Sequence, residues 1–233
     1  PRVRRQRQMC IRDSTNPYHA PGFCEGSAWQ FTWYVPHDVK SLINLIGERQ
    51  FIDRLNAGFA TSEKVSFNAL GDNMGAYPIN HGNETNMQAA YLFSYTSEPW
   101  HTQKWARAIQ EKYYGMGPRD AYPGDEDQGQ MSSWYILSSI GLFQMDGGCS
   151  KDPVWLLGSP RFDRVEILLD NTYYSGKKLI IKAENVSKDN CYIQYVRFNN
   201  KRLSNNYIEW SKLKKGGTLH FIMGDRPNPN AFK

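Results

Sequence analysis

The sequence predicts an α+β fold in which a mainly helical region precedes a segment of β-strands. Apolar residues recur at helical spacing from Val35 to about Leu142. After Gly158 the pattern changes to β-branched and aromatic runs that are broken by turn residues. Runs of helices followed by runs of strands favour an α+β chain with an antiparallel sheet over a parallel α/β fold.

The helical region contains successive amphipathic segments with recognisable ends. Pro99 is well placed in the first turn of one helix, and Gly141 is a stop signal for another. Long loops rich in Gly and polar residues separate the segments and have room to carry function. The predicted helices are 42–46, 51–59, 84–93, a segment that starts at Pro99, and a segment between Gly129 and Gly141.

The strand region has short apolar runs with turn residues between them. Asn199-Asn200 and Gly216-Gly217 supply turn chemistry. The predicted strands are 165–169, 179–183, 192–198 and 219–223.

The length of 233 residues suits one large domain or two small ones. We predict an artefactual or disordered tail over 1–14, a catalytic region over 15–157 and a strand-rich segment over 158–233. No apolar run approaches the roughly 20 residues that a membrane span needs, so we expect no span.

The net charge of +5 is concentrated at the N-terminus, where residues 1–13 hold five arginines and one aspartate. The rest is nearly neutral, which argues against a nucleic-acid partner. Residues 6–14 resemble the translation of a sequencing adapter, as occurs in assembled environmental DNA, so we leave 1–14 out of fold reasoning. We therefore expect a fragment whose gene begins further upstream.

The four cysteines, Cys10, Cys24, Cys149 and Cys191, have no metal-binding spacing and do not indicate a disulfide framework. One bridge remains open in an oxidising compartment.

Three loop-to-helix junctions combine acids, amides and aromatic residues. They lie at 25–38, 81–84 and 124–132. Taken singly, Asp38, Glu84 and Asp127 read as helix caps or first-turn acids. A cap requires no neighbouring tryptophan, histidine or glutamine, so the shared context favours a site.

Paired carboxylates without another nucleophile motif indicate glycoside hydrolysis, in which one acid protonates the leaving oxygen and the other activates water or attacks the sugar. The sequence has no nucleophile elbow, P-loop, dinucleotide fingerprint or zinc-protease helix. Hard oxygen ligands from Asn83, Glu84, Asp125 or Asp127 suit calcium (Ca2+) better than zinc.

At these residues the chain resembles the C-terminal portion of glycoside hydrolase family 92 α-mannosidases. The resemblance runs from Tyr18 to Asn228, and the matching blocks are Glu25–Gln30, Val35–Asp38, His81–Glu84, Glu126–Ser132 with Trp134-Tyr135, and Gly158–Pro160. It implies a calcium-dependent, inverting, exo-acting enzyme, built from an N-terminal β-sandwich and an (α/α)6 barrel. It also implies that the substrate is a mannose-containing glycan such as an N-glycan, and that the protein is periplasmic or secreted.

The resemblance also assigns residue roles. Glu25 is expected to be the general acid, and Asp127 with Asp125 the general base. Asn83 and Glu84 are expected to help hold calcium and the terminal sugar. The expected sugar contacts or orienting residues are Trp29, Gln30, His37, His81 and Gln130.

Several alternatives stay open. Where the family commonly continues with a proline and paired histidines, this chain has Thr85 to Gln88, so the linkage preference is open. The other functions considered are a non-catalytic carbohydrate-binding module and another helical-barrel glycosidase. Because half a barrel leaves an apolar face uncovered, we expect the isolated chain to be inactive.

Overall fold

The computed structural model describes residues 23–65, 67, 77–118, 120–122 and 124–233. The predicted tail over 1–14 lies outside the described residues. The chain forms two compact units: one comprises Pro1–Ala90 and Ile109–Ser133, the other Tyr91–Ala108 and Trp134–Lys233. The domain boundary at 157/158 stays a prediction, and each unit is described separately below.

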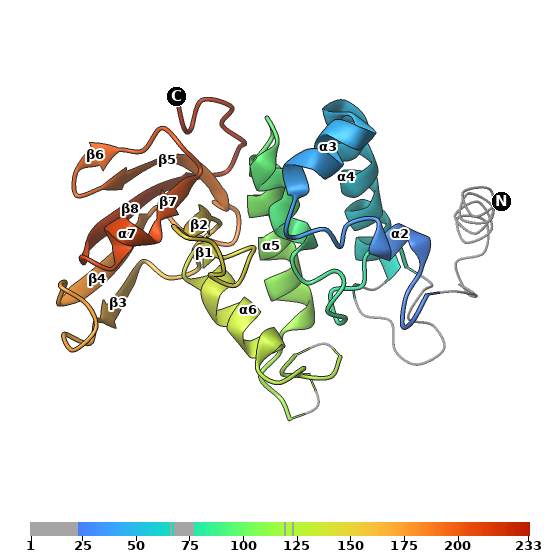
Figure 1. Cartoon of the computed structure of the whole chain (residues 1–233), viewed down its shortest axis with the longest axis horizontal. Coiled ribbons are helices and arrows are strands. Elements are labelled where there is room, and N and C mark those ends of the chain that lie inside the picture. The colour runs from blue at the N-terminus through green and yellow to red at the C-terminus, as the bar shows by residue number, and fades with distance from the viewer. Residues whose placement is uncertain (1–22, 66, 68–76, 119, 123) are drawn as a thin grey trace. The chain divides into compact units, whose positions relative to one another are not determined.

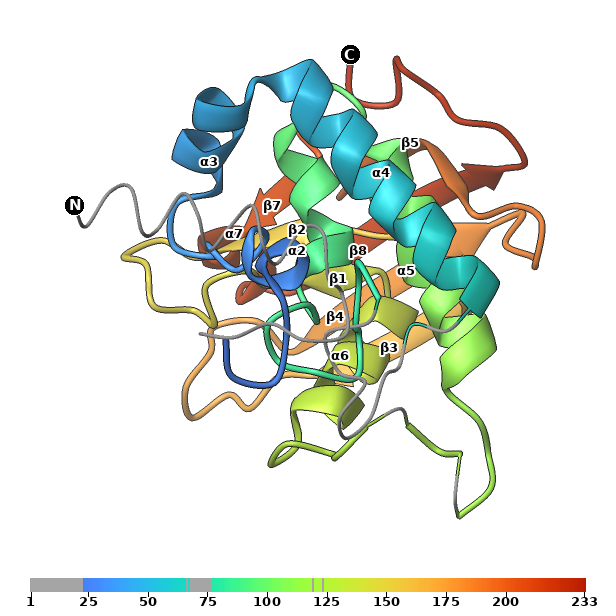
Figure 2. The same ribbon diagram turned by 90° about the vertical axis from the view of Figure 1, so that its right-hand side faces the viewer.

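The first unit is helical, as the apolar spacing predicts. Its helices are α2 (Ala28–Phe31), α3 (Val39–Ile46) and α4 (Glu48–Val65), together with the end of α5 (Trp100–Tyr113) and the start of α6 (Gln130–Ser139). α3 leads into α4 (Figure 2). Gly47 separates the two helices, and its φ of 87° ends α3 in a conformation that suits glycine.

The core of the first unit forms around the apolar stripe of α4. Phe51, Ile52, Leu55 and Phe59 are almost fully buried there. Spacings of three and four residues place these side chains on one face of the helix, which is the reason for the predicted pattern.

The predicted helix over 84–93 differs from the observed structure. Its first part is a series of turns, and only Ala89–Tyr95 is helical, as a 3-10 helix (η2). The backbone N–H of Asn86 donates to Asn83 O (3.0 Å) and that of Ala89 donates to Asn86 O (3.0 Å). These bonds span three residues, so the segment is wound more tightly than an α-helix.

The second unit contains two sheets. A small antiparallel sheet has the strand order β1-β2-β7, and a larger sheet has the order β3-β4-β8-β5-β6 (Figure 1). The bounds are β1 Leu142–Phe143, β2 Val154–Leu157, β3 Arg164–Leu168, β4 Lys178–Glu184, β5 Tyr192–Phe198, β6 Lys201–Arg202, β7 Tyr207–Glu209, the short helix α7 Trp210–Leu213 and β8 Gly217–Gly224.

All four predicted strands are present, but two expectations about them are wrong. β4 and β8 are parallel, with Ile181 opposite Leu219, so the larger sheet is mixed rather than antiparallel. The long connection through β5, β6, β7 and α7 makes this pairing possible, since parallel strands need a crossover. Strands also begin before Gly158, because β1 and β2 precede it.

Alternating side chains of the central strands form the core of the second unit. Leu179, Ile181 and Ala183 of β4 are buried, as are Leu219 and Phe221 of β8. The strand period of two directs these residues to one face of the sheet.

A buried arginine fixes the Gly-Ser-Pro block within the second unit. Arg107 of α5 is 5% exposed and donates to Ser159 Oγ (3.0 Å), Pro160 O and Ser187 O (3.0 Å). These hydrogen bonds satisfy much of the guanidinium group, whose burial would otherwise be costly. The block therefore has a structural role.

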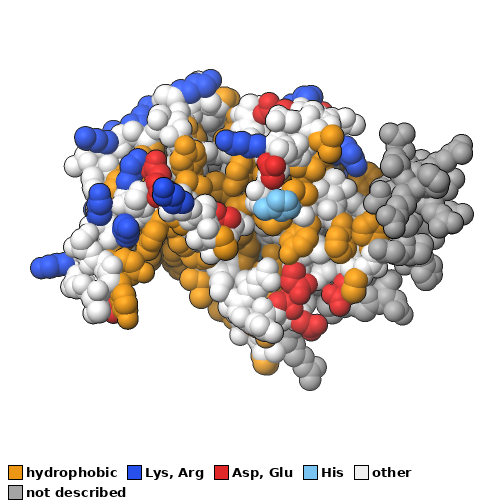
Figure 3. Space-filling model, viewed as in Figure 1, with side chains coloured by type: hydrophobic (Ala, Val, Ile, Leu, Met, Phe, Trp, Pro, Cys, Tyr) orange, Lys and Arg blue, Asp and Glu red, His pale blue; other side chains and the backbone are white. Residues whose placement is uncertain are grey.

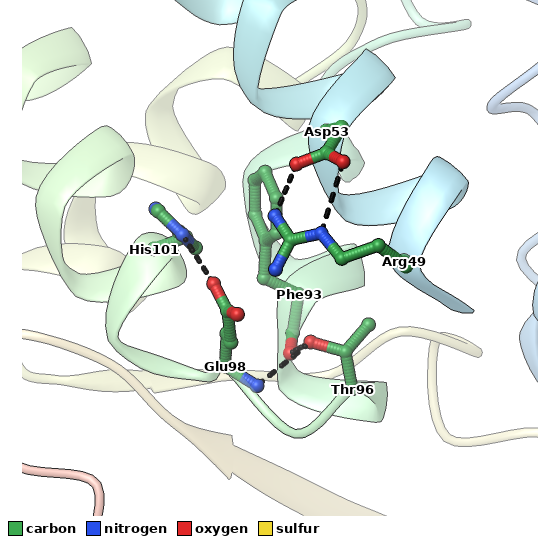
Figure 4. A network of polar contacts seen from close by, with 6 residues as sticks. All are labelled: Arg49, Asp53, Phe93, Thr96, Glu98 and His101. Carbon is green, nitrogen blue, oxygen red and sulfur yellow. Dashed lines mark hydrogen bonds and ion pairs between the residues drawn. The ribbon is translucent and has the colours of Figure 1, made fainter.

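Figure 4 shows two polar side-chain pairs, one in each unit. In the first unit, Arg49 pairs with Asp53 one turn further along α4, and Nε lies 2.9 Å from Oδ2. In the second unit, His101 Nε2 lies 2.9 Å from Glu98 Oε2. The exposed Arg49–Asp53 pair contributes little to stability because water screens it.

No helix within the described ranges has both the length and the apolar character to cross a membrane.

The first prediction compares two leucines of the larger sheet. Leu219→Ala should lower the free energy of unfolding by about 2–5 kcal/mol, because Leu219 is fully buried. Leu168→Ala is the matched control; Leu168 is 77% exposed, so the change should stay within about 0.5 kcal/mol. Urea unfolding measures both, and equal losses would contradict the assigned core.

The second prediction concerns the cap of α3. Asp38 accepts a hydrogen bond from Ser41 N (3.1 Å), so the cap read from the sequence is confirmed. Hydrogen bonds from Ser41, first from its side chain, lower the pKa of Asp38 below 3.8. The stabilisation is therefore present at neutral pH and is lost as pH falls through this lowered pKa.

Asp38→Asn provides the comparison, because asparagine caps a helix without titrating. The difference in Tm between the wild type and Asp38→Asn should change between about pH 7 and about pH 2 in the direction of lost wild-type stability. A difference that is constant with pH would show that the Asp38 carboxylate does not act as a charged cap.

Candidate active site

The candidate site residues all lie in the first unit: on the loops that precede α2, α3 and α6, on the loop around residue 82, in α2 and at the start of α6. Glu25 is exposed and has a φ of 53°. Asp127 and Gln128 have φ values of 55° and 59°. Left-handed backbone at residues other than glycine costs about 1–3 kcal/mol and clusters at functional sites. Two of these three residues are the predicted acid and base.

Asn83 attaches the loop around residue 82 to the backbone of Glu25. Its Nδ2 donates to Glu25 O over 2.6 Å, and its Oδ1 accepts from Glu84 N over 3.0 Å. Asn83 is 3% exposed, so both bonds are shielded from competing water. The bond to Glu25 joins two loops that are far apart in the sequence.

A second contact joins the loop around residue 82 to the loop before α6. A Cβ atom on Gly124 would lie 2.2 Å from Gly82 O, and Gly124 has a φ of 71°. Only glycine permits both the conformation and the approach. This contact brings the segment with Asp125 and Asp127 to the segment with Asn83.

The start of α6 is capped by Glu126 rather than by Asp127. The Glu126 carboxylate accepts from the backbone N–H of Gly129 and from Ser132 N (3.2 Å). A hydrogen bond from the Ser132 side chain is the largest cause that lowers the pKa of Glu126. The cap interpretation of Asp127 is therefore wrong, and its carboxylate is not needed for the helix end.

Asp127 lies in a negative electrostatic environment. Burial raises its pKa above 3.8, and the charges of Glu84, Asp125, Glu126 and Glu25 raise it further, in that order. These carboxylates belong to three separate loops, so the fold has brought the predicted acid, base and calcium residues together. Figure 3 shows a group of Asp and Glu side chains on the visible face of the molecule.

Trp29 and Gln30 of α2 have different surroundings. The Trp29 ring is half-buried and lies under the Arg54 guanidinium, with 5.3 Å from Cζ to the ring centroid. Gln30 is fully buried, and its Nε2 donates to Tyr77 O over 2.8 Å. The Gln30 side chain therefore points into the protein and holds the backbone at Tyr77. Its predicted sugar contact stays a prediction.

His37 and Gln130 are exposed. Gln130 begins α6, and its backbone N–H donates to Asp127 O over 3.3 Å, so it directly follows the acidic loop. His37 adjoins the α3 cap, where its charge contributes to the lowered pKa of Asp38. Both side chains are accessible to a ligand, and their sugar contacts stay predictions.

His81 is buried and held by a tyrosine. Its Nε2 lies 2.9 Å from Tyr114 Oη, and the Tyr114 hydroxyl donates to Met131 O over 3.3 Å. That direction makes His81 Nε2–H the donor to Tyr114. Burial lowers the pKa of His81 to about 3, so the ring is neutral. Its predicted substrate contact remains a prediction beside this observed bond.

Tyr114 is a residue that the sequence did not single out. Fourteen tyrosines occur in the chain, and no motif distinguishes this one. Tyr114 connects Met131 of α6 to His81 in the loop around residue 82, and this contact exists only in the folded protein.

The calcium prediction rests on the donor types. Within the ranges described, no three or more His, Cys, Asp or Glu side chains are grouped so as to hold a metal ion. The crowding of carboxylate charge on Asp127 nevertheless suits a divalent cation, and carboxylate and amide oxygens are the ligands that calcium prefers. Calcium stays a prediction.

Taken together, the first unit presents two carboxylates from separate loops that interact electrostatically, within a larger acidic group. An exposed carboxylate and a partly buried one, from different loops, are the kind of groups that a glycoside hydrolase uses as its proton donor and as the group that activates water.

Comparison with known proteins supports this class and gives the family. Residues 3–225 match the model described as the glycosyl hydrolase family 92 catalytic domain, so the chain belongs to this family of glycoside hydrolases.

Solved structures of the same family are similar to the chain. The GH92 alpha-mannosidase BT3965 from Bacteroides thetaiotaomicron is 33% identical, with a TM-score of 0.78 over 93% of this chain and 27% of its own. The GH92 inverting mannosidase BT2199 from the same organism is 30% identical, with a TM-score of 0.73 over 90% of this chain and 29% of its own.

A curated relative, described as an uncharacterized secreted glycosidase from Arthroderma benhamiae, is 29% identical over 203 residues. The match covers 86% of this chain and 23% of the relative. The chain therefore spans about a quarter of the length of the proteins that it matches.

The third prediction tests the loop contact at Gly124. Gly124→Ala should destabilise the protein by at least about 1 kcal/mol more than Gly129→Ala, because the added methyl group would overlap Gly82 O. Gly129 is the matched control, since it also has a positive φ of 95° but has nothing within 4 Å of its added Cβ. Urea unfolding measures both losses, and equal values would contradict the contact.

Proposed function

We propose that the chain is the C-terminal catalytic part of an inverting exo-α-mannosidase that removes terminal α-linked mannose from glycans. One observation carries the proposal: Asn83 binds Glu25 O over 2.6 Å and Gly82 lies against Gly124, so the loops with Glu25, Glu84 and Asp127 meet although they are far apart in the sequence. Burial, then the charges of Glu84, Asp125, Glu126 and Glu25, raise the pKa of Asp127 there. A surface that only binds sugars has no need for such a group of carboxylates. The family match and the similar α-mannosidase structures support mannose as the sugar.

Glu25 is the proposed general acid. Its backbone is held by Asn83, while its side chain is exposed and so can reach the leaving oxygen of a glycan that binds from solvent. A rigidly placed carboxylic acid protonates that oxygen as the bond to the sugar breaks.

Asp127 is the proposed general base, with Asp125 beside it. Burial and neighbouring carboxylates make the Asp127 carboxylate more basic, which improves proton abstraction from water. Glu126 holds the helix end, so Asp127 is left for this role. An inverting site places its acid and base on opposite sides of the sugar, with water between base and ring.

Glu84 and Asn83 are the proposed protein ligands of a calcium ion. Asn83 Oδ1 accepts one hydrogen bond, from Glu84 N, and an amide oxygen has a second lone pair for a cation. When bound, calcium would hold sugar hydroxyls and offset the negative charge of the acidic group.

Trp29, His37 and Gln130 are the proposed sugar contacts with accessible side chains. An aromatic ring offers an apolar face to the C–H groups of a sugar, and the imidazole and amide groups bind its hydroxyls. His81 and Gln30 would support the site from below the surface.

We further propose that the helices form part of an (α/α)6 barrel and that an N-terminal β-sandwich of the same protein completes it. The small share of each similar structure that the chain covers supports this proposal. A secreted or periplasmic location, as the name of the curated relative suggests for that protein, suits an enzyme that acts on N-glycans.

The fourth prediction tests this function by mannose release. The protein is expressed with the sequence that precedes it in its gene, and free mannose is measured from α-linked mannosides. Release should stop with EDTA and return with calcium. Glu25→Gln and Asp127→Asn should each lower kcat by about 10²–10⁴-fold, because each removes one acid–base group.

Asp53→Asn is the control variant, since Asp53 lies on the exposed face of α4 in an ion pair with Arg49, and it should leave release unchanged. The chain of 233 residues alone should release no mannose, and full activity from it would refute the fragment proposal. Binding of mannosides without release would favour a carbohydrate-binding module. Release of a different sugar would favour another helical-barrel glycosidase.

A further inference from the structure

The backbone conformation at Glu25 requires support from its surroundings. Its φ of 53° is costly for a residue with a side chain. The segment that follows is tightly confined, because Ser27 and Gln30 are fully buried and a Cβ on Gly26 would lie 2.7 Å from Gln30 Oε1. Glu25 and the start of α2 therefore form one tightly packed piece of the chain.

Two buried asparagines attach this piece to the loop around residue 82. Asn83 binds Glu25 O, as described above. Asn86 Nδ2 donates to Gln30 O and to Thr85 O, each over 2.9 Å, and Asn86 Oδ1 accepts from Asn80 N over 2.9 Å. Asn86 is 1% exposed, and its amide group is hydrogen-bonded to protein backbone.

The bond to Gln30 lies at the end of α2. Gln30 O also accepts from the backbone N–H of Trp33 (3.2 Å), and Phe31 N donates to Ser27 O (3.0 Å). A helix of four residues has too few internal bonds to hold itself. The Asn86 amide thus supplies a bond to α2 from outside the helix.

We propose that Asn86 is a positioning residue of the active site: it fixes α2 and thereby the strained Glu25 against the loop that carries Glu84. Asn83 and Asn86 form two fixed points, one at each end of the segment from Glu25 to Gln30. These two bonds fix the backbone of the segment at both ends, and the bond from Gln30 Nε2 to Tyr77 O adds a side-chain attachment. The effect of this positioning on catalysis rests on the proposed function, in which Glu25 is the general acid.

The fifth prediction measures this positioning by amide hydrogen exchange of the 233-residue chain. In Asn86→Ala and Asn86→Asp, the amides of Phe31 to Trp33 should exchange about tenfold faster, because the backbone of α2 loses a bond from outside the helix. Amides of α4 should change by less than about twofold. Asn86→Asp keeps an acceptor for Asn80 N but adds a buried carboxyl group, and Asn86→Ala adds no charge but loses the acceptor, so both variants must show the effect.

Ser62→Ala is the control variant. Ser62 is also fully buried in the first unit, and its Oγ accepts from Ile79 N over 3.0 Å, without a bond to α2. This variant should lower Tm without accelerating exchange in α2. If Ser62→Ala accelerates the same amides equally, the effect of Asn86 is general destabilisation and the proposal is overturned.

Folded Asn86 variants with unchanged α2 exchange would also overturn the proposal. If neither variant folds, the wild type decides the matter by NMR: the side-chain amide protons of Asn86 should exchange at least about tenfold more slowly than those of an exposed asparagine. Fast exchange of these protons would refute the bond to Gln30.

Activity distinguishes positioning from the proposed function itself. In the extended protein, Asn86→Ala and Asn86→Asp should each lower kcat for mannose release at least about fivefold and leave KM within about twofold, because substrate still binds while the acid is misplaced. An unchanged kcat would refute the positioning role. A wild type that releases no mannose would refute the mannosidase, and the exchange measurement would still test the positioning of Glu25.

Discussion

The hydrogen bond from Asn83 Nδ2 to Glu25 O is the interaction on which the active site depends. It holds the proposed acid in a left-handed conformation that an isolated segment would leave. It also fixes Glu25 against the loop with Glu84, which contacts the loop with Asp127 through Gly82 and Gly124. The buried Asn83 amide therefore joins the loop with Glu25 to the loop around residue 82, and through it to the loop with Asp127.

Glu126 and Asp127 are adjacent acidic residues with different roles in the structure. Glu126 binds the N-terminus of α6, and the resulting bonds lower its pKa. Asp127, the next residue, has a raised pKa because burial and like charges disfavour its ionised form. The pKa values of these two neighbouring carboxylates thus shift in opposite directions, because Glu126 accepts hydrogen bonds and Asp127 is partly buried among like charges. Carboxylates with perturbed pKa values are typical of functional sites.

Buried polar side chains recur at the points where loops join. Asn86, His81 and Arg107 each bind backbone carbonyls or side chains far away in the sequence. In a folded chain an unpaired polar group of this kind would cost more than the bond gains, so these contacts admit few alternative arrangements. Precision at the loops comes from such bonds together with close packing, as at Gly124 against Gly82, because turns lack the regular hydrogen-bond ladders of helices and sheets.

The sequence alone determined the positions of α3, α4, α5 and α6, the four main strands and the residue types of the candidate site, because helical spacing, strand runs and loop motifs are local signals. Only the tertiary structure decided that β4 pairs in parallel with β8, that η2 is a 3-10 helix, that Glu126 rather than Asp127 caps α6, and that His81 and Gln30 are buried. Each of these depends on contacts between distant segments, which no local pattern encodes.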